Sequence, residues 1–395
     1  PYDQNASSPF FDPEWMFGIK EGFDVVIGNP PYVDSEHMVV SDLENRELYS
    51  RNYISTIGNW DLFVPFIEIG MKLGSILSLI IPNKLISQDY AIRIRQLILE
   101  KQLIEIRDYS RQNVFPIADV YPITILLRNS KLCDKYNVKI TTMKSIEIVE
   151  KMNVLENEML KNYPWDLFFL NLEQSSIFIK LLKNKKQFKD YLNFHSPCTV
   201  TEAYQIKNYL VDSISFIKGK KLINSGTIDK YVSKWGVDKT TYIKSQYKYP
   251  VISDSDIRKL NERRYLQSVA KKIIIANMTS NLEAFLDINS EYLAGKSTVI
   301  GIGDDSSLFY IVSLLNSKLI SKYYKSVHHS TKMKGGALSV TADRLGELPL
   351  PESDLYKEAI CEIGRKIVQI KSLTQVSDTT ILEQQIDNLV YKLYD

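Results

Sequence analysis

The stretch Phe23-Asp-Val-Val-Ile-Gly-Asn-Pro-Pro-Tyr32 decides the fold of the first part of this chain. Its apolar run from Phe23 to Ile27 has the length and composition of a buried strand, and Gly28 ends that run. The two prolines after Asn29 fix the backbone and remove two N–H donors, so carbonyl oxygens there face outward without sheet partners. The sequence therefore predicts a strand that runs into a rigid polar loop with an aromatic ring at its tip.

The chemistry of this loop suits a primary amine. The side-chain oxygen of Asn29 and the carbonyl oxygen of Pro30 would place two hydrogen-bond acceptors at one point, which matches an –NH2 group with two protons. The ring of Tyr32 would lie against the flat face of the group that carries the amine. The structural alternative is a tight turn after a core strand, because Asn-Pro dipeptides commonly start turns.

The motif Asn29-Pro30-Pro31-Tyr32 resembles the catalytic motif of amino-methyltransferases that use S-adenosylmethionine, above all the adenine-specific DNA methyltransferases. The resemblance implies that Asn29 and Pro30 hold the exocyclic N6 amine of an adenine flipped out of duplex DNA, while Pro31 keeps the loop rigid and Tyr32 stacks on the base. The implied activity is site-specific DNA methylation in a restriction–modification system, without a covalent enzyme intermediate.

The likeness covers nearly the whole chain and is greatest to gamma-type, TaqI-like enzymes. Asp61-Leu-Phe63 and the run from Gly74 to Asn83 resemble the middle motifs of that group. Phe115 stands where the family has a second ring against the flipped adenine, although a core residue before a strand is equally consistent with it. Residues 226–236, 314–324, 345–351 and 382–394 resemble the target-recognition domain and the ending of such enzymes.

The order of predicted strands and helices indicates an α/β fold. Their alternation with short connections predicts a mostly parallel, doubly wound sheet, in which ligands bind at the carboxyl ends of strands. We expect a partial Rossmann-like methyltransferase sheet in residues 1–145, an α+β target-recognition domain in residues 146–350 and C-terminal helices in residues 351–395. The polar residues 34–58 predict a long mobile loop.

The overall composition limits the partners, bound metals and cellular compartment that we expect for the protein. The 395 residues carry a formal net charge of only +2, so any surface for nucleic acid must be a local basic patch. The three cysteines and four histidines lack the spacing of a metal site or a disulfide framework, which fits a reducing cytoplasm. We expect no bound metal, and no apolar stretch is long enough to span a bilayer.

Local clusters of basic residues, with one tryptophan, are the candidates for contact with double-stranded DNA. Lysine and arginine bind phosphates, and aromatic rings stack on bases. A solvated surface cluster is the alternative at each position. The candidates are Lys218, Lys220, Lys221, Trp235, Arg263, Arg264, Lys332 and Lys334.

The resemblance does not locate the S-adenosylmethionine site. Gamma-type enzymes place a glycine-rich loop before the strand of the catalytic motif, whereas residues 1–22 contain only Gly18 and Gly22 and no preceding strand. We therefore expect the cofactor-binding front half to lie outside these residues, in a longer protein or a partner chain. A permuted enzyme would instead use Gly301 and Gly303, which follow an apolar run and precede a predicted helix.

Other functions share parts of this pattern. A protein-glutamine methyltransferase uses the same tetrapeptide on a side-chain amide, but it would not need a large trailing domain. A non-catalytic DNA-specificity subunit or fragment, acting with a partner chain, would explain the missing cofactor loop. A fused endonuclease would lie outside these residues, because no nuclease-like cluster of carboxylates and lysine is evident.

Overall fold

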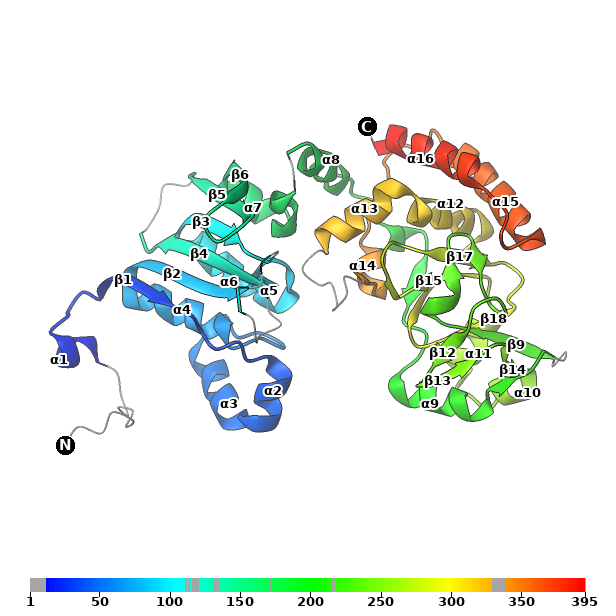
Figure 1. Ribbon diagram of the computed structural model, residues 1–395, viewed down its shortest axis with the longest axis horizontal. Coiled ribbons are helices and arrows are strands. Elements are labelled where there is room, and N and C mark those ends of the chain that lie inside the picture. Colours follow the sequence, from blue (N-terminus) through cyan, green and yellow to red (C-terminus); the bar gives the residue numbers. More distant parts are fainter. Residues whose placement is uncertain are drawn as a thin grey trace. The chain divides into compact units, whose positions relative to one another are not determined.

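The computed structural model describes residues 12–110, 112, 114–115, 121–130, 135–170, 172–214, 218–328 and 338–394. The chain forms two compact units, Pro1–Leu172 and Glu173–Asp395 (Figure 1). Residues 146–172 thus belong to the first unit, although they follow the domain boundary predicted at residue 145. Among the described residues, no helix combines the length and apolarity needed to cross a membrane.

The first unit is built on a six-stranded sheet with the order β1-β2-β4-β3-β5-β6. Two neighbouring pairs, β1–β2 and β3–β5, are parallel, and the other three pairs are antiparallel. In that order the strands are β1 Phe23–Gly28, β2 Gly74–Pro82, β4 Pro122–Arg128, β3 Gln102–Asp108, β5 Asn137–Met143 and β6 Val149–Glu156.

The α/β class is confirmed, but the predicted mostly parallel sheet is wrong. Strand β4 lies between β2 and β3 and is antiparallel to both. Strand β6, which the sequence did not suggest, forms a hairpin with β5 through residues 144–148, and so short a connection allows only antiparallel pairing.

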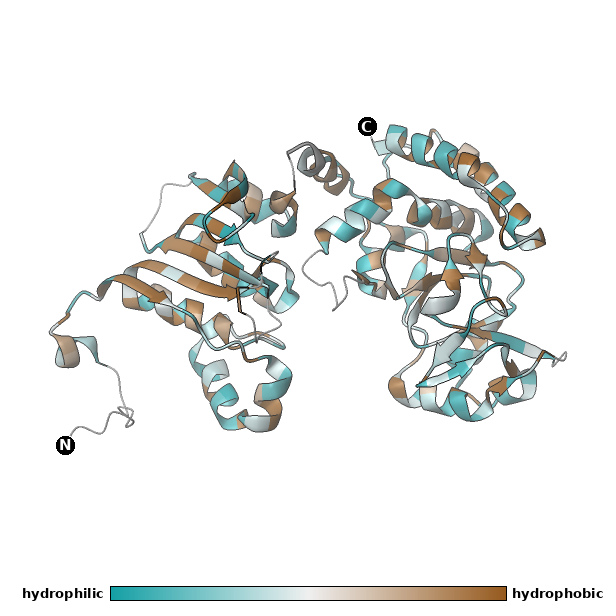
Figure 2. Ribbon diagram, viewed as in Figure 1, coloured by the Kyte–Doolittle hydropathy of each residue, from teal (hydrophilic) through white to brown (hydrophobic). Residues whose placement is uncertain are grey.

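Helices α4, α6 and α7 pack against this sheet, whereas α2 and α3 pack against each other. Helix α4 packs against β1 and β2 and buries Phe63, Ile67 and Met71. Figure 2 shows the hydrophobic colour concentrated on β2 and β4, where Leu77 and Ile125 are buried. The helices are α1 Pro13–Phe17, α2 Ser35–Ser41, α3 Leu43–Asn52, α4 Phe63–Leu73, α5 Lys84–Ser87, α6 Ile92–Leu99 and α7 Asn157–Asn162.

The long mobile loop predicted for residues 34–58 is wrong, because α2 and α3 occupy much of it. The side chain of Asp34 accepts a hydrogen bond of 2.8 Å from the backbone N–H of His37 and so caps the start of α2. Helix α3 is polar nearly all round, so it lacks the apolar stripe by which a helix is recognised in a sequence.

The second unit contains two four-stranded sheets and three two-stranded pairs within the described residues. The first sheet has the order β18 Tyr292–Ala294, β9 Gly219–Ile223, β14 Pro250–Ser253 and β8 Val211–Asp212. The second has the order β17 Ala284–Asp287, β15 Lys272–Ala276, β19 Thr298–Ile302 and β7 Asn193–His195. The pairs are β10 Ile228–Asp229 with β11 Val232–Ser233, β12 Thr240–Tyr242 with β13 Ser245–Tyr247, and β16 Met278–Thr279 with β20 Leu338–Ser339.

The helices of this unit are α8 Leu172–Leu182, α9 Val200–Tyr209, α10 Asp254–Ile257, α11 Glu262–Val269, α12 Asp305–Asn316, α13 Lys318–Val327, α14 Ala342–Gly346, α15 Lys357–Leu373 and α16 Thr380–Tyr394. The last two confirm the predicted C-terminal helices; α15 packs on α12, and α16 packs on α15 and α13. The helix predicted after Gly301 and Gly303 is followed at once by a second helix, because Ser317 caps the start of α13.

Candidate active site

The Asn29–Tyr32 loop lies at the carboxyl end of β1, as predicted. Gly28 is the last residue of β1 and pairs with Leu79 of β2. In the loop that follows, Pro30 is buried while Asn29 and Pro31 are exposed. The loop is therefore anchored by one proline and leaves the Asn29 side chain accessible to a ligand.

Tyr32 is fixed by β2 and by Phe115. Its hydroxyl donates a hydrogen bond of 3.2 Å to the carbonyl oxygen of Ile80. Its ring meets the ring of Phe115 edge-on, with 5.8 Å between the centroids and 79° between the planes. Burial raises the pKa of the Tyr32 phenol to about 12, so the hydroxyl remains a donor across the physiological range. The two aromatic residues singled out from the sequence thus lie in contact.

Asp61, which lies just before α4, contacts the segment that follows the loop. Its Oδ1 accepts a hydrogen bond of 3.3 Å from the backbone N–H of Ser35, and its Oδ2 forms an ion pair of 2.7 Å with the Nζ of Lys84. A backbone hydrogen bond of 2.9 Å from the N–H of Leu62 to the carbonyl oxygen of Val33 runs beside them. Lys84 could not be recognised from the sequence, because it is 23 residues from its partner.

A half-buried tyrosine, Tyr90, lies close to this carboxylate. Burial is the largest cause that raises the pKa of Tyr90, and the negative charges of Asp61 and Asp34 add to it. The Tyr90 ring also lies 6.5 Å from the ring of Phe63, centroid to centroid. Tyr90 therefore stays a neutral phenol and adds no second negative charge beside Asp61, whose compensating cation is Lys84.

The two glycines proposed for a permuted cofactor loop are explained by packing. Gly301 belongs to β19, a strand paired on both sides, with β15 and β7. A Cβ atom at Gly303 would collide with the side chain of Leu192 and lie 2.9 Å from the carbonyl oxygen of Tyr191. Asp304, the next residue, caps α12 by accepting a hydrogen bond from the N–H of Ser307. These contacts account for the glycines without a cofactor.

Lys221 and Trp235 are brought together in the second unit. The Lys221 ammonium lies 5.4 Å from the Trp235 ring and 5.3 Å from the Tyr292 ring, and forms an ion pair of 2.6 Å with Glu291. The indole N–H of Trp235 donates to the carbonyl oxygen of Pro250. Lys221 is therefore held in a fixed position rather than left free in solvent.

The other DNA-contact candidates differ in their surroundings. Lys218 and Arg263 are exposed, whereas the Lys220 ammonium donates a hydrogen bond of 2.6 Å to the carbonyl oxygen of Ser290. Lys332 and Lys334 lie outside the described residues. Exposure alone thus leaves Lys218 and Arg263 as the cations of this set that are most available to a phosphate.

Arg264 must be removed from the DNA-contact candidates, because it lies in the core of the second unit. Its side chain is only 1% exposed. The guanidinium donates to the carbonyl oxygens of Pro197 and Ala294 and to the side chain of Gln267. Burial lowers the pKa of Arg264. These bonds make it a cross-link between segments of the unit.

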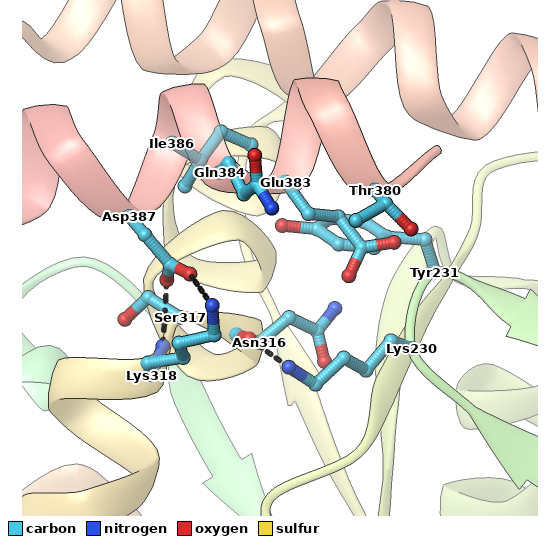
Figure 3. Close-up of a pocket in the computed structure, with 10 residues that line it drawn as sticks. All are labelled: Lys230, Tyr231, Asn316, Ser317, Lys318, Thr380, Glu383, Gln384, Ile386 and Asp387. Carbon is cyan, nitrogen blue, oxygen red and sulfur yellow. Dashed lines mark hydrogen bonds and ion pairs between the residues drawn. The ribbon is translucent and has the colours of Figure 1, made fainter. Parts of the chain in front are cut away.

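A small polar cavity beneath α16 is a poor candidate for a cofactor site (Figure 3). Its volume is about 100 Å³, below the ~300 Å³ at which small-molecule sites usually begin. Its charged side chains are engaged, because Lys318 pairs with Asp387 at 3.3 Å and the Lys230 ammonium donates to the carbonyl oxygen of Asn316. The space suits a few water molecules.

Two known families match separate parts of the chain. Residues 3–115 match the Eco57I restriction-modification methylase family, and residues 228–350 match the TaqI-like C-terminal specificity domain. The first match contains the Asn29–Tyr32 loop, Asp61 and Phe115, and the second contains Trp235 and Arg264.

Individual relatives agree with these matches. A putative type II restriction enzyme and methyltransferase of Methanocaldococcus jannaschii is 24% identical over 392 residues, which are 95% of this chain and 31% of that protein. The Eco57I type II restriction enzyme and methyltransferase of Escherichia coli is 29% identical over 109 residues, which are 27% of this chain and 11% of that protein. The chain thus spans less than a third of either relative.

A solved structure supports the fold. The type IIL restriction-modification enzyme MmeI, in complex with DNA, has a TM-score of 0.50 and is 11% identical. The similarity covers 94% of this chain and 54% of that chain. At this identity the likeness is one of fold alone.

Proposed function

We propose that this chain, which joins an Eco57I-type restriction-modification methylase domain to a TaqI-like specificity domain, holds the target base and recognises DNA in an adenine-specific DNA methyltransferase. The overall reaction would transfer a methyl group from S-adenosylmethionine to the N6 amine of a flipped adenine. The observation that carries the proposal is the placement of the Asn29–Tyr32 loop at the end of β1, with Phe115 against Tyr32.

The loop would act by holding the amine. The side-chain oxygen of the exposed Asn29 and the carbonyl oxygen of Pro30 accept hydrogen bonds from its two N–H groups, which directs the nitrogen lone pair and makes the nitrogen a better nucleophile. The ring of Tyr32 stacks on the base, held in place by its bond to Ile80. Stacking on an aromatic ring contributes about 1–3 kcal/mol for each base, enough to offset much of the cost of unstacking it from DNA.

The described residues do not form a site for S-adenosylmethionine, the donor of the activated methyl group. No glycine-rich loop precedes β1 in them, and the glycines at 301 and 303 are packed against Leu192 and Phe194. We infer that a segment beyond the described residues, in the same protein or a partner chain, holds the cofactor.

The free edge of β1 supports that inference. Strand β1 pairs with β2 on one side, and its apolar residues Val25 and Ile27 are 53% and 77% exposed. Exposed, apolar edge strands are sites at which a further strand pairs. The cofactor-binding part would add its strands there and bring the methyl group to the amine held by Asn29.

The second unit would supply sequence recognition. Its similarity to TaqI-like specificity domains covers Trp235, and the exposed Lys218 and Arg263 are suited to phosphate contacts. Phosphate contacts position a protein on DNA, whereas contacts with base edges select the sequence. Recognition by this unit would place the target adenine at the loop of the first unit.

The test is genome-wide mapping of N6-methyladenine in a host without adenine methylation that expresses the full open reading frame encoding the chain. We expect methylation at one short DNA sequence, and Asn29→Ala should abolish it. Asn52→Ala is the matched control, because Asn52 is exposed at the end of α3. Persistent methylation in Asn29→Ala would refute the assigned role of the loop.

A second function, that of a non-catalytic specificity fragment, is favoured by one observation, the absence of a cofactor cradle among the described residues. It predicts sequence-specific DNA binding without methylation in the same host. The mapping experiment combined with a DNA-binding assay therefore separates the two functions.

A further inference from the structure

We propose that Asp61 and Lys84 form a positioning pair that sets the orientation of the catalytic loop, an inference that rests on the proposed function. Neither residue is assigned to bind the base. Their effect would pass through Ser35, three residues after Tyr32 along the chain, whose N–H donates to Asp61.

The loop needs external anchors because of its own composition. Pro30 and Pro31 have no N–H group, so they cannot donate hydrogen bonds that would fix the loop. The residues that follow carry the restraints instead. Tyr32 donates to Ile80, Val33 accepts from Leu62, and Ser35 donates to Asp61. The last two bonds join the loop to the segment that precedes α4.

Asp61 can serve as an anchor because its carboxylate is buried and paired. Its side chain is 8% exposed, and a buried carboxylate is costly without a cation and hydrogen bonds. Lys84, at the start of α5, supplies the cation at 2.7 Å. Because α5 follows directly on β2, the pair ties the loop after β1 to the end of the neighbouring strand.

The chain offers a matched control for this pair. Glu68 on α4 is also buried, accepts a hydrogen bond of 3.0 Å from the N–H of Ser55, and pairs with Lys72 at 3.0 Å. In both ion pairs, a buried carboxylate accepts a hydrogen bond from a backbone N–H and pairs with a lysine that is at least partly exposed. Only the Asp61–Lys84 pair contacts the segment that follows the catalytic motif.

The experiment compares Lys84→Met with Lys72→Met in the methyltransferase made from the full open reading frame. A misplacement of about 1 Å can lower a rate by about 100-fold, so we expect kcat to fall by about that factor in Lys84→Met, with little change in KM for DNA. Lys84→Arg should restore kcat because it keeps the charge. Lys72→Met should lose comparable thermal stability but keep kcat.

Hydrogen–deuterium exchange of this chain gives a readout that needs no cofactor. Asp61→Ala should speed exchange in the peptide covering residues 29–41, and Lys84→Met should do so to a smaller extent. The inference is overturned if exchange there is unchanged, or if Lys84→Met and Lys72→Met have equal kcat. Asn29→Ala serves as the reference: if it retains methylation, the proposed function fails, whatever the lysine variants show.

Discussion

The ring of Phe115 meets the ring of Tyr32 edge-on, with centroids 5.8 Å apart and planes inclined at 79°. A base between two parallel rings needs about 7 Å between them, since stacked atoms lie about 3.5 Å apart. The observed arrangement leaves no such space. A flipped adenine must therefore turn the Phe115 ring before both residues can stack on it.

This relationship predicts that Phe115 contributes to holding the base but not to the chemistry of the amine. Phe115→Ala should weaken binding of DNA with a flipped target by about 1–3 kcal/mol, the usual contribution of one stacked ring. Fluorescence of 2-aminopurine at the target position should increase, because one quenching ring is lost. Unchanged fluorescence and affinity would place Phe115 outside the base site.

Tyr32 should act through its ring rather than through ionisation of its hydroxyl. Tyr32→Phe removes the hydrogen bond to Ile80 and should cost about 1 kcal/mol of unfolding free energy, while methylation stays within a few-fold. Tyr32→Ala should lose the stacking energy as well. A loss of activity in Tyr32→Phe as large as in Tyr32→Ala would contradict this assignment.

The raised pKa of Tyr32 predicts a specific dependence of stability on pH. The pKa rises from 10.0 to about 12 in the folded protein because of burial. The neutral phenol is therefore favoured by folding, so its contribution is complete below pH 10 and is lost as the pH rises toward 12. Thermal melts should show the wild-type protein losing stability relative to Tyr32→Phe above pH 10, and parallel curves would contradict the shift.

Arg263 and Arg264 should behave oppositely although they are neighbours. Arg263→Met should reduce the affinity for DNA, with little effect on folding. The slope of log affinity against log salt concentration should fall by about 1, the contribution of one phosphate contact. Arg264→Met should leave the oxygens of Pro197, Gln267 and Ala294 without their donor and destabilise the second unit by about 3 kcal/mol. Melting and fluorescence anisotropy at several salt concentrations measure both effects.

The cofactor prediction is tested by calorimetric titration of S-adenosylmethionine into this chain, with and without duplex DNA. We expect no binding heat, because the described residues contain no cradle for it. Clear binding would place the cofactor site within these residues and make the segment around Gly301 and Gly303 the first region to mutate.

The sequence predicted those features of the two units that depend on neighbouring residues. The strand from Phe23, the loop after it and the C-terminal helices all have strong local patterns. Strand direction could not be predicted in the same way, because it depends on which distant strands become neighbours. Helices α2 and α3 were missed for a different reason, since α2 is short and α3 is polar nearly all round; the side chain of Asp34 caps α2, whereas Asp42 forms no side-chain cap bond at the start of α3.

The candidate site was likewise predictable only where its residues are close in sequence. Asn29 and Tyr32 were recognisable because their motif is contiguous, whereas Asp61 and Lys84 meet only in three dimensions. Arg264 was misassigned because α11 buries a polar stripe formed by Arg264, Gln267 and Ser268. A hydrophobic pattern cannot reveal a buried face made of polar residues that satisfy one another.

The central claim is that the Asn29–Tyr32 loop binds the exocyclic amine of a flipped adenine. Its most direct test measures the affinity of the wild-type chain and of Asn29→Ala for two unmethylated duplexes. Both carry the recognition sequence found by the mapping experiment, with a mismatch opposite the target base. One duplex has adenine at the target position. The other has the unsubstituted base purine there, which lacks the exocyclic amine. We predict that the wild-type chain prefers adenine by about 1–2 kcal/mol and that Asn29→Ala loses the preference. An equal preference in both proteins would contradict the claim.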